Sequence, residues 1–141
     1  AGRWTERRLA GGVTLIDDSY NANPESLRVS VEALAESFPA WVVLGDMGEL
    51  GDQGPMLHRR AGEHMRAMGI ERVFALGPLA AETAAGFGPG GTAYDDRDAL
   101  VAALRESLRP GVSVLVKGSR AAAMERVVNA LVEAADRAGG Q

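Results

Sequence analysis

The sequence predicts an α/β fold, with a doubly wound, mostly parallel sheet and helices on both faces. Apolar runs of strand length alternate with segments whose apolar residues recur at helical spacing. Two of the runs, Ala40–Leu44 and Val112–Val116, are almost continuously apolar, which is typical of parallel strands buried on both faces. The length of 141 residues fits one such domain.

The N-terminal elements are predicted to be two short strands. Trp4–Leu9 and Val13–Ile16 are joined by a Gly11-Gly12 turn, so one N-terminal strand is expected to be antiparallel. The second strand ends at Asp17-Asp18. A helix follows, for which Asn23 is a suitable cap and Pro24 a suitable first residue. The apolar positions predicted to share one face of this helix are Leu27, Val31, Leu34 and Phe38.

The middle of the chain repeats the strand and helix pattern. Strand Ala40–Leu44 leads through the glycine-rich loop Gly45–Gly54 into a helix from Pro55 that ends at Gly69. Strand Arg72–Leu76 precedes a short helix over Leu79–Ala85. The predicted buried face of the Pro55 helix is Leu57, Ala61, Met65 and Met68.

The last third is predicted to hold two strands and two helices. A brief strand over Thr92–Tyr94 precedes a helix that starts at Asp95 and Asp98 in a pattern like a capping box. Strand Val112–Val116 ends in Lys117–Arg120, before the last helix. The apolar residues of the two helices are Leu100, Leu104 and Leu108, then Met124, Val127, Val128, Leu131 and Ala135. Residues 1–136 are expected to form the domain, and residues 137–141 a frayed tail.

Composition excludes several classes of protein. Hydrophobic residues are 46% and charged residues 24%, close to globular averages, and the net charge of −4 argues against a nucleic-acid partner. The chain has no cysteine, which excludes disulfides and a thiol nucleophile. Because no apolar run is long enough to cross a bilayer, we expect no membrane insertion and a cytoplasmic location. The start at Ala1, without Met, indicates a piece of a longer polypeptide.

Three polar segments follow predicted parallel strands and are expected at one edge of the sheet, where such folds bind ligands. They are Asp17–Pro24, Gly45–Gly51 and Lys117–Arg120. The first offers carboxylates for ribose hydroxyls or for a divalent ion, together with Tyr20 and asparagine amides. The last places two cations and a hydroxyl just before a helix, which suits a phosphate or a carboxylate. In a purely structural interpretation, Ser119 and Asn23 only cap helices.

Other motifs are weak or missing. The chain lacks the P-loop order of residues and a G-x-G-x-x-G after its first strand, so it carries no complete nucleotide site of either type. His58 and His64 have no ligand partner at metal-binding spacing, and a surface or packing role is expected for each.

The three segments, in order, resemble the C-terminal domain of the Mur ligase family. The matching stretches are Asp17–Pro24, Leu44–Gly51 and Val116–Arg120 with Met124-Glu125, and the resemblance covers nearly the whole chain. It implies a Rossmann-like domain of an ATP-dependent ligase that joins D-alanyl-D-alanine to UDP-N-acetylmuramoyl-tripeptide, a step of peptidoglycan synthesis. In that reaction a peptide carboxylate is phosphorylated and the dipeptide amine displaces the phosphate.

The resemblance also assigns site residues. Asp18, Tyr20, Asn21 and Asn23 would line the nucleotide side, with Asp18 at the ribose, and Asp46, Lys117, Ser119 and Arg120 would face the dipeptide and the reacting groups. No catalytic residue is assigned. ATP and Mg²⁺ would be held mainly by a central domain, and the sugar nucleotide by an N-terminal one, both absent from this chain. The chain alone is therefore expected to be inactive, with a hinge to the other domains near residues 1–3.

Two other interpretations remain open. A phosphoacceptor receiver domain would use Asp17, Asp18 and Lys117, although Asp46 follows the wrong strand for it and Gly118 stands in place of the usual proline. A standalone binding domain of the same fold is the second, because a fold does not fix a function.

Overall fold

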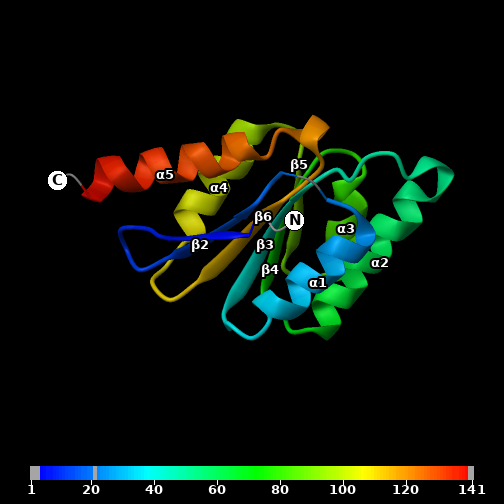
Figure 1. Ribbon diagram of the computed structural model, residues 1–141, viewed down its shortest axis with the longest axis horizontal. Helices are drawn as coiled ribbons and strands as arrows, with labels where there is room; N and C mark the ends of the chain where they lie inside the picture. The colour runs from blue at the N-terminus through cyan, green and yellow to red at the C-terminus, as the bar shows by residue number, and fades with distance from the viewer. Residues whose placement is uncertain (1–3, 21, 140–141) are drawn as a thin grey trace.

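The computed structural model describes residues 4–20 and 22–139. Within them, six strands form one sheet in the order β1-β2-β6-β3-β4-β5, with five α-helices packed on it (Figure 1). The strands are β1 (Thr5–Arg8), β2 (Thr14–Asp18), β3 (Ala40–Gly45), β4 (Arg72–Leu76), β5 (Gly91–Tyr94) and β6 (Ser113–Lys117). The helices are α1 (Pro24–Leu34), α2 (Gly54–Ala67), α3 (Ala80–Phe87), α4 (Arg97–Ser107) and α5 (Glu125–Gly139), with 3-10 turns η1 (Gly51–Gln53) and η2 (Arg120–Ala122).

The sheet is mostly parallel, as the sequence predicts. β1 pairs with β2 antiparallel, and every other neighbouring pair is parallel. Helices α1, α2 and α3 cover one face, and α4 and α5 cover the other (Figure 1). Each face has its own apolar core, so the doubly wound α/β fold is confirmed.

Helix α1 begins as predicted and ends earlier. The Asn23 side chain accepts a hydrogen bond from the backbone N–H of Ser26, whose hydroxyl in turn accepts from the Asn23 N–H, so the capping box is reciprocal. The helix ends at Leu34, and Phe38 is 70% exposed. The prediction that Phe38 shares the buried face was wrong, because the chain has already left the helix to turn towards β3.

The buried face of α2 is rotated by one residue from the predicted one. The buried residues are Gly54, His58, Gly62 and Met65, whereas Leu57 and Ala61 are only half-buried. The reason is close packing with α3: a Cβ added to Gly62 would lie 2.0 Å from the Thr83 carbonyl oxygen. A helix that approaches so closely places its glycines, and not its larger apolar residues, at the contact.

Two other helix starts differ from the prediction. The cap of α4 is Asp96, whose carboxylate accepts from the Ala99 N–H, and not Asp95. Helix α5 begins at Glu125, after turn η2 and a left-handed Ala123 at φ 53°. It continues to Gly139, beyond the predicted end of the domain.

Candidate functional site at the carboxyl ends of the strands

Strand β6 lies between two strands whose following helices are on the opposite face of the sheet from its own helix. Strands β2 and β3 flank β6, and the helices that follow them, α1 and α2, lie on one face of the sheet. Helix α5, which follows β6, lies on the other face (Figure 1). Chain segments that leave neighbouring parallel strands in opposite directions define a topological switch point, where α/β folds bind ligands.

All three predicted polar segments meet at this switch point. Asp18 of β2 and Leu44 of β3 both lie opposite Lys117 of β6 in the strand register. One step further, the Ser119 N–H donates to the Asp46 carbonyl at 3.0 Å, which ties the loop after β6 to the loop after β3. The expectation that the three segments converge on one edge is confirmed.

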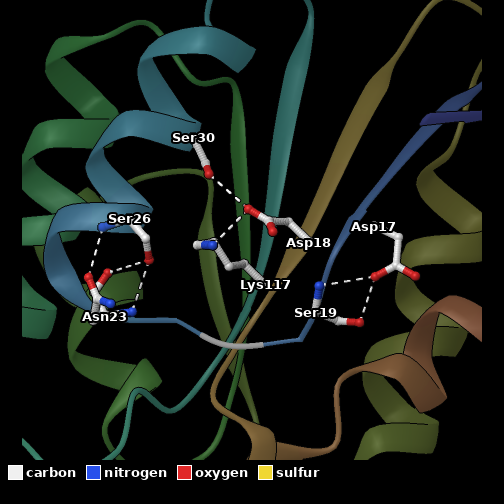
Figure 2. Close-up of polar contacts among 7 residues, drawn as sticks. All are labelled: Asp17, Asp18, Ser19, Asn23, Ser26, Ser30 and Lys117. Carbon is white, nitrogen blue, oxygen red and sulfur yellow. Dashed lines mark hydrogen bonds and ion pairs between the residues drawn. The ribbon is translucent and has the colours of Figure 1, made fainter. Parts of the chain in front are cut away.

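The first part of the site is a buried network around Asp18 (Figure 2). Lys117 Nζ donates to Asp18 Oδ2 at 2.7 Å, and the Ser30 hydroxyl of α1 donates to the same oxygen at 2.9 Å. The side chains of Lys117 and Asp18 are only 2% and 13% exposed. Among the described residues, no hydrogen bond reaches the other carboxylate oxygen, Oδ1, and it is not a buried unsatisfied atom. Asp18 therefore has one oxygen fixed within the chain and one open to a ligand.

Asp17 does not share this network. It is the neighbour of Asp18 within β2, and consecutive strand residues point to opposite faces. Figure 2 shows the two carboxylates on opposite sides of the strand. Asp17 Oδ1 accepts from the Ser19 N–H at 3.0 Å and from its hydroxyl at 2.6 Å. The interpretation in which both carboxylates hold one divalent ion is therefore wrong.

The remaining residues assigned to the nucleotide side are at the surface. Tyr20 is 47% exposed, and the Arg120 guanidinium lies 5.2 Å from the centre of its ring. The Asn23 side chain is engaged in the cap of α1 (Figure 2). Asn21 lies outside the described residues. Tyr20 and Arg120 thus form an exposed cationic and aromatic pair beside the Asp18 network.

The second part of the site is built around Asp46. Asp46 Oδ1 accepts from the Ala80 N–H at 2.7 Å, at the start of α3. Gly77 lies against this carboxylate: with φ at 113°, an added Cβ would be 2.5 Å from Oδ1. The glycine is needed here, because a side chain would displace the carboxylate.

Asp46 borders an open cavity of about 370 Å³. The cavity lies between the loops after β3 and β4 and turn η2. Among the described residues that line it, only Asp46 is charged, and Ser119 adds a hydroxyl that makes no hydrogen bond within the described part of the chain. The other lining residues are small or apolar: Met47, Gly48, Leu76, Gly77, Leu79, Ala121 and Ala122. Such a cavity suits a small ligand with short apolar side chains and a polar end.

The segment Lys117–Arg120 differs from its predicted form. It leads into turn η2, and α5 starts only at Glu125, so the segment does not stand at a helix N-terminus. The Ser119 side chain caps nothing. Contrary to the prediction, no α-helix dipole favours an anion at this segment. Lys117 is buried, which leaves Arg120 as the exposed cation of the segment.

Sequence reasoning missed Ser30 and the exact role of His58. Ser30 lies between Leu27 and Val31 on the buried face of α1. A polar residue among the buried positions of a helix could have indicated its role in the sequence. His58 is completely buried, which agrees with the predicted packing role and not with a surface role. The sequence could not predict the hydrogen bond between His58 and the loop after β3, because this bond joins α2 to a residue eleven positions away.

Within residues 4–20 and 22–139, no group of three or more acidic, histidine or cysteine side chains could hold a metal ion. The same residues contain no helix long and apolar enough to cross a membrane.

The fold and the site together define a class of protein: an α/β domain that binds a ligand at a topological switch point of a parallel sheet. The chain belongs to the Mur ligase family, because the family model described as "Mur ligase, glutamate ligase domain" matches residues 2–120. The resemblance seen in the three polar segments is thereby confirmed.

Curated relatives carry one activity in their names. The UDP-N-acetylmuramoyl-tripeptide–D-alanyl-D-alanine ligase of Escherichia coli (strain K12) is 42% identical over 138 residues, which cover 94% of this chain and 30% of that protein. The ligase of the same name from Mycobacterium tuberculosis (strain H37Rv) is 38% identical over 147 residues, covering 86% and 29%. The chain thus spans about 30% of the length of these relatives.

Solved structures agree. A MurF ligase from Thermotoga maritima, in complex with ADP, matches with a TM-score of 0.81 at 28% identity, over 96% of this chain and 31% of that one. A MurF structure from Acinetobacter baumannii matches with a TM-score of 0.83 at 29% identity, over 94% and 30%. The α/β fold of this chain is therefore the fold of the matching part of these ligases.

Proposed function

We propose that this chain is the C-terminal domain of an ATP-dependent ligase that joins D-alanyl-D-alanine to UDP-N-acetylmuramoyl-tripeptide. The observation that carries the proposal is the meeting of three family motifs around β6, at the edge where such folds bind ligands. The relatives' names support the substrates. A role in peptidoglycan synthesis and a cytoplasmic location are parts of the same proposal.

The reaction forms an amide bond. ATP transfers a phosphoryl group to the terminal carboxylate of the tripeptide and leaves as ADP. The dipeptide ammonium loses a proton to become the amine, which attacks the activated carbonyl carbon. Inorganic phosphate then leaves with the electrons of the broken C–O bond, and the nitrogen loses a second proton to solvent as the amide forms. The residues of this chain bind and orient the nucleotide and the dipeptide. Orientation of two reactants lowers the entropic barrier to such a step.

The nucleotide side is proposed at the Asp18 network. Asp18 Oδ1 is free to accept a ribose hydroxyl, while Lys117 and Ser30 hold Oδ2. Lys117 balances the carboxylate charge, so that a buried negative charge does not repel the phosphates. The exposed ring of Tyr20 can cover a base, and Asn21 and Asn23 complete the assigned set.

The dipeptide side is proposed at the cavity beside Asp46. Its small and apolar lining residues match two methyl side chains, and the carboxylate of Asp46 matches the ammonium that the dipeptide carries before it reacts. Ser119 lines the cavity and can donate a hydrogen bond, while the exposed cation of Arg120 suits the dipeptide carboxylate. Of the four assigned residues, Lys117 acts indirectly, through Asp18.

Mg²⁺ does not fit the described residues. Asp17 and Asp18 point apart, and β6 separates both of them from Asp46. We therefore place Mg²⁺ and the triphosphate in other domains of the ligase. The same geometry counts against a receiver domain, since phosphoacceptor chemistry needs several carboxylates around one divalent ion.

The test is an assay of the complete open reading frame that contains residues 1–141. We expect phosphate release that requires ATP, the tripeptide nucleotide and D-alanyl-D-alanine together, and none from the 141-residue chain alone. Acetyl phosphate with Mg²⁺ is the control for the receiver alternative, which predicts a gain of one phosphoryl mass. Ligation by the chain alone, or that mass gain, would contradict the proposal.

The predicted hinge to the other domains, near residues 1–3, lies outside the described residues. Domain closure would exclude water from the activated carboxylate. Small-angle scattering of the complete protein should show a more compact particle with ligands bound, and identical profiles would contradict closure.

A further inference from the structure

His58 of α2 is a buried histidine whose two ring nitrogens both contact the backbone. The Met47 N–H donates to Nε2 at 2.9 Å, and Nδ1 lies 2.7 Å from the Gly54 carbonyl oxygen. His58 and Met47 are both completely buried.

The two partners determine the protonation of the ring. A backbone N–H can only donate, so Nε2 must carry a lone pair, and a backbone carbonyl can only accept, so Nδ1 must carry the proton. His58 is therefore held as the neutral tautomer with hydrogen on Nδ1. Only this tautomer satisfies both contacts.

The residue that His58 holds lies inside the proposed site. Met47 stands between Asp46 and Gly48, and all three line the cavity of about 370 Å³. Two further hydrogen bonds fix the same loop, from Ser119 N–H to the Asp46 carbonyl and from the Ala80 N–H to its carboxylate. The hydrogen bond from the Met47 N–H to His58 joins the centre of this loop to α2.

The element that carries His58 is itself fixed. The Thr83 hydroxyl of α3 donates to the His58 carbonyl at 2.7 Å. One turn away, Gly62 of α2 lies so close to α3 that a methyl group would not fit, and Gly86 of α3 is equally close to the Arg59 carbonyl. The α2–α3 pair is therefore a close-packed support, and small shifts of His58 are restricted.

We propose that His58 is a positioning residue for the incoming amino substrate. Through the Met47 N–H it sets the backbone of Asp46–Gly48, and thereby the place of the Asp46 carboxylate in the cavity. His58 does not touch the substrate. This inference rests on the proposed function, in which the cavity receives the dipeptide.

Two variants of the complete protein separate the two ring contacts. His58→Gln offers an amide oxygen near the position of Nε2 and can keep the acceptor for Met47, whereas His58→Asn offers an amide N–H near Nδ1 and loses that acceptor. We expect His58→Asn to raise the KM for D-alanyl-D-alanine by about tenfold, the scale of one lost hydrogen bond, with the KM for ATP unchanged. The KM of His58→Gln for D-alanyl-D-alanine should be close to that of the wild-type protein.

A second measurement does not depend on ligation. In long-range ¹H–¹⁵N spectra of the 141-residue chain, Nδ1 of His58 should be protonated and Nε2 not. Amide exchange at Met47 should be slow in the wild-type chain and in His58→Gln, and at least tenfold faster in His58→Asn. The opposite tautomer, or unchanged exchange in His58→Asn, would overturn the inference.

The variant Asp46→Asn tests the proposed dipeptide site separately from the role of His58. A raised dipeptide KM in Asp46→Asn, with a normal one in His58→Asn, overturns the role of His58 and leaves the proposed function intact. Normal dipeptide KM values in both variants overturn both. An equal rise of the KM for ATP and for the dipeptide in His58→Asn would indicate general damage and would also overturn the positioning role.

Discussion

Two acidic residues at opposite edges of the sheet are paired in different ways. Glu71, at the amino ends of the strands, uses both carboxylate oxygens: Trp41 Nε1–H donates to Oε1 at 2.7 Å, and Arg109 donates to Oε1 and Oε2 at 3.1 and 3.3 Å. Asp18, at the carboxyl ends, accepts both of its hydrogen bonds on Oδ2 and leaves Oδ1 open. A carboxylate satisfied on both oxygens serves the fold, and one satisfied on a single oxygen can also serve a ligand.

The surroundings of the two edges follow the same division. At the amino edge, the guanidinium of Arg72 lies 5.1 Å from the ring of Trp41 and 4.7 Å from that of Phe74, so cations and aromatic rings cover the ends of the strands. At the carboxyl edge, glycines, alanines and larger apolar side chains line an open cavity beside Asp46 and Ser119. We therefore expect substitutions at the amino edge to lower stability without changing substrate affinity, whereas substitutions at the carboxyl edge should lower substrate affinity.

The largest effect is expected for Trp41→Ala. Trp41 is completely buried, and its removal should lower the free energy of unfolding by about 3–5 kcal/mol, with no change in the KM for ATP or the dipeptide in molecules that remain folded. Tyr20→Ala is the matched aromatic control at the other edge. It should change stability by less than about 1 kcal/mol and raise the KM for ATP. Chemical denaturation and steady-state kinetics measure both, and a reversed pattern would contradict the division of the edges.

The next largest effect is expected for substitutions in the Asp18–Lys117 pair. Lys117→Met leaves a mostly buried carboxylate without its cation and should lower the free energy of unfolding by about 2–3 kcal/mol, below the range for a fully buried pair because Asp18 is 13% exposed. Adding Asp18→Asn should restore most of the stability but no ligase activity. A double variant that is stable and active would show that the pair has no role in the reaction.

A smaller effect is expected for Ser119→Ala. The hydroxyl makes no hydrogen bond among the described residues, so stability should change by less than about 0.5 kcal/mol. The KM for D-alanyl-D-alanine should rise about tenfold, because one hydrogen bond to the substrate is lost. Ser113→Ala, at the amino end of β6, is the control and should leave that KM unchanged. Equal KM values in the two variants would remove Ser119 from the site.

The smallest effect concerns Glu71 and pH. The hydrogen bond from Trp41, and next the guanidinium of Arg109, hold the pKa of Glu71 below its ordinary value of 4.5. Because the folded-state pKa is the lower one, this stabilisation is fully present above pH 4.5 and is lost as the pH falls through the folded-state pKa. Since the side chain is about one-third exposed, the contribution should stay below about 1 kcal/mol. Wild-type and Glu71→Gln unfolding curves should differ at pH 6 and converge in acid; a constant gap would contradict this origin.

Much of the fold could be predicted from the sequence, because strand runs and caps are local signals. The continuous apolar run at Ala40–Leu44 and the Asn23 cap of α1 are both confirmed. The buried face of α2 could not be predicted, since it depends on how closely Gly62 approaches α3. The prediction that Phe38 is buried was also wrong. The helical spacing of apolar residues continues to Phe38, although the helix has ended by then and the chain has turned away.

The sequence could predict where the site lies, but not which of its side chains pair with one another. Parallel strand ends meet at one edge, so the convergence of the three segments followed from topology alone. The opposite directions of Asp17 and Asp18 follow from strand alternation once β2 is seen to include both residues. The pairing of Asp18 with Lys117 required the strand order, because these residues are 99 positions apart.

The most direct test of the account compares the KM for ATP in Asp18→Asn and Glu71→Gln, two matched acid-to-amide changes in the complete protein. We expect Asp18→Asn to raise it about tenfold or more, since a charged acceptor for the ribose is replaced by a neutral amide, and Glu71→Gln to leave it unchanged. If the two variants give the same KM for ATP, the open oxygen of Asp18 does not contact the nucleotide, and the functional distinction between the two edges is wrong.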